Sequence, residues 1–78
     1  MPTLRLFASV RVAAGTGAAT VPGTTVAEVV AAAVDRFGPG FGDLLQPCRI
    51  WVNGEPAGPH DPVGEADEVA ILPPVSGG

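Results

Sequence analysis

The chain has 78 residues, 46% of them apolar, with four arginines against eight acidic residues and a formal net charge of −4. A single small domain of this length depends on its hydrophobic core, because Cys48 is the only cysteine and cannot form a disulfide or a cysteine-based metal site. The acidic charge and the absence of a long apolar run argue against nucleic-acid and membrane partners, and without an export signal we expect a cytoplasmic protein.

The amino-terminal part of the chain predicts a β-hairpin. Residues 3–8 alternate in polarity as a strand does, with the even-numbered side chains through Ala8 pointing into the core and Phe7 pointing away. A link at 9–14, with room for one helical turn, leads through a glycine-rich turn to a return strand at 18–21.

The clearest helix is expected at residues 26–37, where apolar side chains recur at spacings of three and four. Thr25 and Glu28 have the spacing of a capping box, in which each side chain accepts a hydrogen bond from a free backbone N–H at the helix start. Gly38 suits the helix end, and Pro39 should prevent the helix from continuing.

The second half of the chain predicts three more strands. Asn53-Gly54 is a strong signal for a two-residue type I′ turn, which needs positive φ at both positions. In chain order we expect a loop at 40–47, a strand at 48–52, a return strand around 56–57, a loop at 58–67 and a last strand at 68–72.

The predicted order is therefore β-β-α-β-β-β, with one main helix packed on a mixed sheet. If the first and last strands pair in parallel at the sheet centre, this is the β-grasp, or ubiquitin-like, arrangement of the α+β class. We expect one β-grasp domain at residues 1–74 and a flexible tail at 75–78.

The most informative segment is Pro73-Pro74-Val75-Ser76-Gly77-Gly78, which directly follows the last strand. Two prolines stiffen its base, and glycines without a Cβ fit a narrow passage in another protein. Four residues beyond Pro74 span about 13 Å. A carboxylate is a poor electrophile at neutral pH, so we expect Gly78 to be activated with ATP by a partner, while this chain binds no cofactor.

The stretch from Asp67 to Gly78 resembles the carboxyl-terminal signature of the MoaD family, the small, sulfur-carrying subunit of molybdopterin synthase. Three earlier segments resemble that family's first strand and turn, helix start and central hairpin, respectively: Phe7-Ala8 with Arg11 and Gly15, Thr25-Val26-Ala27-Glu28, and Val52-Asn53-Gly54. The resemblance covers essentially the whole chain.

This resemblance implies a cycle of sulfur transfer. A ubiquitin-activating-enzyme-like adenylyltransferase adenylates Gly78, and a sulfurtransferase system converts it to a thiocarboxylate. The loaded tail, with Gly77, Ser76 and Val75, then enters the large catalytic subunit, where sulfur passes to cyclic pyranopterin monophosphate to build molybdopterin. The chain is a co-substrate in this cycle, and the catalytic residues belong to its partners.

Several apolar residues predict a partner interface near the tail. Phe7, Trp51 and Leu72 alternate away from the helix-facing positions, and with Pro73 and Pro74 they form a candidate docking patch. The alternatives are that loops cover some of them, or that the face assignment slips by one residue.

Other reactive or charged side chains suggest no site of their own. Arg11 and Arg49 either meet acidic partner surfaces or, more simply, are solvated. Cys48 is expected to pack in the core because no basic residue is predicted beside it. His60 is expected to be an ordinary loop residue.

Other functions remain open alongside the molybdopterin role. The same chemistry would serve a sulfur carrier for thiamine or cysteine biosynthesis. A ubiquitin-like protein modifier would use the same activated tail, with a lysine amine as the nucleophile. A plain binding module for RNA or an iron–sulfur cluster is opposed by the acidic charge and the single cysteine.

Overall fold

The computed structural model describes residues 1–74. The four tail positions Val75, Ser76, Gly77 and Gly78 lie outside the described residues, and their role stays a prediction.

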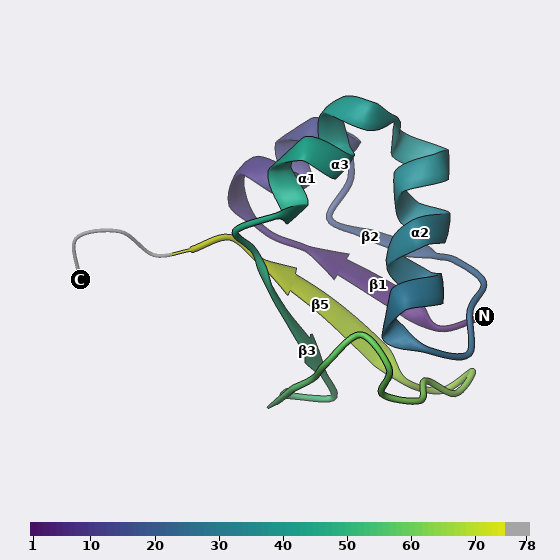
Figure 1. Ribbon diagram of the computed structural model, residues 1–78. Helices are drawn as coiled ribbons and strands as arrows, with labels where there is room; N and C mark the ends of the chain where they lie inside the picture. The colour runs from purple at the N-terminus through teal and green to yellow at the C-terminus, as the bar shows by residue number, and fades with distance from the viewer. Residues whose placement is uncertain (75–78) are drawn as a thin grey trace.

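Five strands form one mixed sheet in the order β2-β1-β5-β3-β4. β1 and β5 pair in parallel at the centre, and every other neighbouring pair is antiparallel (Figure 1). This arrangement confirms the predicted α+β, β-grasp fold. The strands are β1 Thr3–Leu6, β2 Ala18–Thr20, β3 Arg49–Val52, β4 Glu55–Pro56 and β5 Glu68–Leu72.

The main helix, α2, spans Val26–Phe37 and packs over one face of the sheet. Thr25 Oγ1 accepts a hydrogen bond from the backbone N–H of Glu28 at 3.2 Å, as the capping box predicts. The Glu28 carboxylate instead accepts from the backbone N–H and the hydroxyl of Thr24, at 2.8 and 2.9 Å. Those two bonds hold the pKa of Glu28 below its usual range.

The core lies between α2 and the two central strands. Leu4 pairs with Val69 and Leu6 pairs with Ile71 across the parallel ladder, and all four side chains are buried. Because alternate residues of a strand share a face, the same alternation turns Arg5 and Ala70 to the opposite face, which carries no helix.

A short helix, α1, spans Ala8–Ala14 and corrects two sequence predictions. β1 ends at Leu6, so Ala8 is not an inward strand residue: it is exposed, has φ of +53° and begins the helix. The segment expected to be a link is a two-turn helix that buries Val10 in the core.

A second short helix, α3, spans Pro39–Leu45, where a loop was predicted. Pro39 does end α2, but it also occupies the first turn of α3, where its missing N–H has no intrahelical partner to lose. Phe41 is buried, and its ring lies 5.1 Å from that of Phe37, so aromatic packing compensates for the two glycines in this helix.

Candidate functional site at the end of the central strand

The candidate site begins where β5 ends, and β5 is held on both sides. It pairs with β1 and with β3, and its residues Val69 and Ile71 are fully buried. β5 is therefore fixed by two ladders and by the core, and its last residue, Leu72, pairs with Arg49 of β3. Pro73 and Pro74 have no N–H to continue the ladder, and Figure 1 shows the chain leaving the sheet there.

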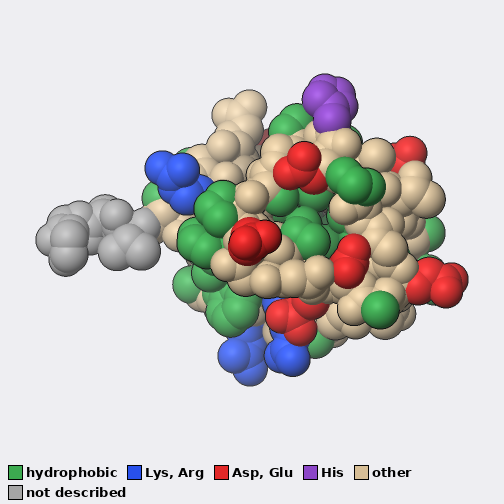
Figure 2. Space-filling model, turned by 90° about the horizontal axis from the view of Figure 1, so that it is seen from below, with side chains coloured by type: hydrophobic (Ala, Val, Ile, Leu, Met, Phe, Trp, Pro, Cys, Tyr) green, Lys and Arg blue, Asp and Glu red, His purple; other side chains and the backbone are tan. Residues whose placement is uncertain are grey.

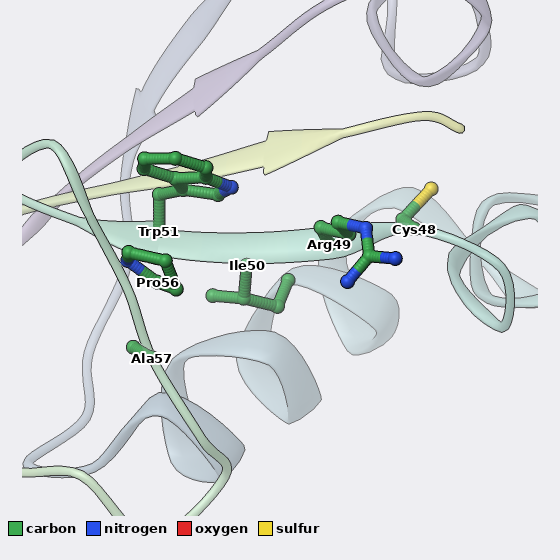
Figure 3. Close-up of a pocket in the computed structure, with 6 residues that line it drawn as sticks. All are labelled: Cys48, Arg49, Ile50, Trp51, Pro56 and Ala57. Atoms are coloured by element: carbon green, nitrogen blue, oxygen red, sulfur yellow. The ribbon is translucent and has the colours of Figure 1, made fainter. Parts of the chain in front are cut away.

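Trp51 and Leu72 lie on the open face of the sheet, away from α2. The register pairs Trp51 with Ala70 and Arg49 with Leu72, so Trp51 and Leu72 are diagonal neighbours on one face. Figure 3 shows Trp51 and Ile50 on opposite sides of β3, with Ile50 on the helix side. The sequence alternation therefore assigned Trp51 and Leu72 to the correct face of the sheet. Both side chains are half-buried.

Phe7 lies at the same end of the molecule, although it no longer belongs to a strand. It precedes α1 with extended backbone angles, φ −132° and ψ 150°, and follows Leu6, which pairs with Ile71 beside Leu72. Its side chain is 43% exposed. We call Phe7, Trp51, Leu72, Pro73 and Pro74 the open-face patch; that a partner contacts it stays a prediction.

Charged groups border the open-face patch. Arg5 Nε donates to Glu68 Oε2 at 3.1 Å, and both side chains are about half exposed, so the pair contributes little to stability. Arg49, opposite Leu72, makes no hydrogen bond or ion pair with the described residues. Figure 2 shows basic side chains toward the end of the molecule where β5 finishes and acidic ones over the rest of that face.

The start of β5 is fixed by a polar cluster that sequence reasoning missed. The side chain of Asn53 donates to Asp67 Oδ1 and accepts from the N–H of Glu68, both at 2.9 Å. Asp67 Oδ2 accepts from the N–H of Gly64 at 2.7 Å. The bonds from Gly64 and Asn53 lower the pKa of Asp67. The spacing of Gly64 and Asp67 was the available signal.

The remaining candidate side chains support no reactive site in this body. The Cys48 thiol packs beside the core and donates to the carbonyl of Leu44 at 3.0 Å, and burial raises its pKa, so it is a poor nucleophile. His60 is exposed. Within residues 1–74 no three side chains group as a metal site would require, and no helix there is long and apolar enough to cross a membrane.

A model of the ThiS family matches residues 4–78 of this chain. The chain therefore belongs to the ThiS family, the ubiquitin-like sulfur carriers of the ThiS and MoaD type. This confirms the resemblance drawn from the sequence at the level of the wider family, whereas the choice of MoaD within it stays a prediction. No curated protein sequence is a significant match.

Solved structures show the same fold. The solution structure of small archaeal modifier protein 1 from Methanosarcina acetivorans is 29% identical, with a TM-score of 0.89, covering 97% of this chain and 94% of that one. A chain of the Amycolatopsis orientalis BexX/CysO complex is 24% identical, with a TM-score of 0.85 and full coverage of both chains. A putative molybdopterin converting factor, subunit 1, from Pyrococcus furiosus is 23% identical, with a TM-score of 0.79, covering 94% and 95%.

Proposed function

We propose that this chain carries sulfur as a thiocarboxylate on Gly78 and donates it to cyclic pyranopterin monophosphate in molybdopterin biosynthesis. The observation that carries the proposal is that the Pro73–Gly78 segment directly follows β5, a strand paired on both sides at the centre of a ThiS-family fold. A partner that binds the folded domain would therefore meet the attachment point of the tail, at the end of β5, in a defined position.

The chemistry belongs to two partner steps. A carboxylate oxygen of Gly78 attacks the α-phosphate of ATP, and pyrophosphate leaves, which forms an acyl adenylate. The terminal sulfur of a sulfurtransferase persulfide then attacks the acyl carbon, and AMP leaves. A thiol reduces the S–S bond of the resulting acyl disulfide, which leaves a thiocarboxylate on Gly78. The folded domain, residues 1–74, is recognised by the partners and positions the start of the tail. Its described residues include no nucleophile placed for either step.

The choice of the molybdopterin pathway rests on the tail sequence. Pro-Pro-Val-Ser before the two glycines resembles the MoaD branch more closely than the carriers for thiamine or cysteine. In this proposal the partners are the large subunit of molybdopterin synthase, the adenylyltransferase and the sulfurtransferase.

Intact mass spectrometry tests the carrier role directly. The chain is expressed together with the adenylyltransferase and a sulfur source, and we expect the mass increase of one oxygen replaced by sulfur. Deleting Gly78 should abolish the increase, while the matched variant Val12→Ala, on α1, should retain it. If the intact chain stays unmodified while a known carrier in the same extract is loaded, the proposal is wrong.

The acceptor is tested separately with the loaded protein. The purified thiocarboxylate form of the protein is mixed with the large subunit and cyclic pyranopterin monophosphate, and the loss of sulfur from Gly78 is followed. Transfer supports the molybdopterin role. If the loaded protein gives no sulfur to cyclic pyranopterin monophosphate but does give it to a thiamine or cysteine precursor, the sulfur-carrier role stands and the molybdopterin pathway is rejected.

Protein modification is the second candidate function. It is favoured by the likeness to small archaeal modifier protein 1, at 29% identity over 97% of this chain. The same activated Gly78 would then acylate a lysine amine of another protein, which gives an amide that survives a denaturing gel. Adducts that require Gly78 would support this function.

A further inference from the structure

The turn between β3 and β4 has a chemically labile sequence and is open to solvent. In an asparagine–glycine pair, the backbone nitrogen of the glycine can attack the side-chain carbonyl carbon of the asparagine, and the missing Cβ leaves that attack unhindered. Asn53 and Gly54 are both exposed. A Cβ built on Gly54 would meet no atom within 4 Å, and the Gly54 N–H makes no hydrogen bond with the described residues. Base and water can therefore reach the reacting atoms.

The reaction open to this pair consumes only water. The Gly54 nitrogen gives its proton to base and attacks Cγ of Asn53, ammonia leaves, and a cyclic succinimide forms. Water then adds to either carbonyl of the ring and opens it, which gives aspartate or isoaspartate. In both products the amide NH2 is replaced by a hydroxyl that ionises at neutral pH, so position 53 gains a negative charge.

The surroundings of Asn53 suit an amide and not a carboxylate. Its Oδ1 accepts from the backbone N–H of Glu68, and its Nδ2 donates to Asp67 Oδ1, both at 2.9 Å. An amide can donate and accept at once, whereas a carboxylate only accepts. A carboxylate at position 53 could keep the bond from Glu68, but it would place a second negative oxygen against Asp67 at hydrogen-bond distance. The attraction at this contact would become repulsion.

Asp67 is held by three other hydrogen bonds, so it cannot move away from position 53 without loss. Its Oδ2 accepts from the N–H of Gly64 at 2.7 Å, and its own N–H donates to the carbonyl of Gly64 at 3.1 Å. Its carbonyl accepts from the N–H of Thr3 at 3.1 Å. The β3–β4 turn, the loop before β5 and the start of β1 therefore meet at Asp67, and repulsion there would act on all three.

We propose that Asn53 is a site of spontaneous deamidation, and that the carboxylate formed there releases the β3–β4 turn from the start of β5. Both hydrogen bonds of the Asn53 side chain lie at the exposed surface, where local opening lets the Gly54 nitrogen approach Cγ. The end of β5 is paired separately, through Leu72 and Arg49, so we expect the release to stay local. This inference is independent of the sulfur chemistry proposed for Gly78.

Intact mass spectrometry with peptide mapping tests the modification. The protein is kept in mildly alkaline buffer for days beside a capped peptide of residues 50–57. We expect Asn53 to exchange NH2 for OH in both, and several-fold more slowly in the protein because two hydrogen bonds hold its side chain. Gln46 is the internal control, because Pro47 after it has no N–H with which to attack. If Asn53 keeps its amide while the peptide is fully converted, the proposal is wrong.

A pair of substitutions tests the consequence of the new carboxylate. Asn53→Asp matches the aspartate product, and aspartate also tolerates positive φ. We expect it to lower the thermal unfolding midpoint at neutral pH by about 4–8 °C, as the loss of one hydrogen bond would. Asp67→Asn should lower the midpoint of the wild type but raise that of Asn53→Asp. In the double variant the amide at position 67 can donate to the carboxylate at 53 and still accept from Gly64.

Glu55→Gln is the matched control in the Asn53→Asp protein, because it removes a nearby carboxylate that bonds to no side chain within residues 1–74. It should not restore the midpoint. Hydrogen exchange in Asn53→Asp should become faster at the Glu68 amide and stay unchanged at Ile71, near the other end of β5. If Asp67→Asn lowers the midpoint equally in both backgrounds, or Glu55→Gln restores it as well, the two carboxylates do not meet and the proposal is wrong.

Discussion

At the scale of single residues, Asn53 does more than form a turn. Its φ of +50° is tolerated best by asparagine and glycine, and Gly54 follows with φ of +84°, as the type I′ signal predicts. Its side chain also ties the hairpin to Asp67 and Glu68, where β5 begins. The strand that presents the tail is therefore fixed at its start by side chains and at its end by the sheet.

Asp67→Asn tests this cluster through its pH dependence. The folded-state pKa of Asp67 lies below the ordinary value of 3.8, so its carboxylate stabilises the fold above that value and loses the contribution as the pH falls through the folded pKa. We expect the wild type to be more stable than Asp67→Asn at neutral pH, and the difference to shrink in acid below pH 3.8. Urea unfolding across this range measures both quantities.

The control for that experiment is Glu55→Gln, an exposed carboxylate of β4 with no hydrogen bond among the described residues. Its free energy of unfolding should stay close to that of the wild type at neutral pH. A difference between wild type and Asp67→Asn that persists unchanged into acid would mean that the ionised carboxylate is not what stabilises the cluster.

At the scale of elements, the periodic patterns predicted α2 and β5 correctly, whereas the two short helices were not predicted. The apolar spacing of α2 and the alternation of β5 gave both elements their observed bounds. α1 was missed because it begins at Ala8 with a positive φ, which no local preference of alanine indicates. α3 contains a proline and two glycines, which predict a loop, and it forms because Phe41 packs against Phe37.

The candidate site, likewise, was predicted from the sequence only in part. Strand alternation sufficed to place Trp51 and Leu72 on the open face, because period two leaves only two choices. The polar cluster of Asn53 and Asp67 was beyond the sequence, because it depends on tertiary contacts between the β3–β4 turn and the start of β5.

Two valines of α1 measure how firmly this unexpected helix is packed. Val10 is fully buried, whereas Val12 is 81% exposed. We expect Val10→Ala to lower the free energy of unfolding by about 1–3 kcal/mol, from lost burial and a residual cavity. Val12→Ala should change it by less than about 0.5 kcal/mol. Equal effects in urea unfolding would show that the segment is a loose link, as the sequence suggested.

At the scale of the whole molecule, the helices and the strand residues of the open-face patch, Trp51 and Leu72, lie on different sides of the sheet. α1, α2 and α3 cover one face of the sheet, and the other face stays open beside the end of β5 (Figure 1). The helix-covered face of the sheet contains the core that stabilises the fold, so residues on the uncovered face are available for contact with partners. We predict that a partner that contacts this face also lies next to Pro73, where the chain leaves β5, so that recognition of the domain is linked to use of Gly78.

Trp51→Ala tests whether the open-face patch is that recognition surface. Trp51 is half-buried on the open face, where truncation leaves the core between α2 and the sheet intact, so the amide spectrum should remain that of a folded protein. We expect binding to the adenylyltransferase, measured by calorimetry, to weaken at least about tenfold, as for an aromatic interface anchor. Val12→Ala, an exposed apolar residue of the helical layer, is the matched control and should bind normally. If Trp51→Ala binds as tightly as the wild type while Gly78 is still loaded with sulfur, the patch is not the recognition surface and the carrier function stands without it.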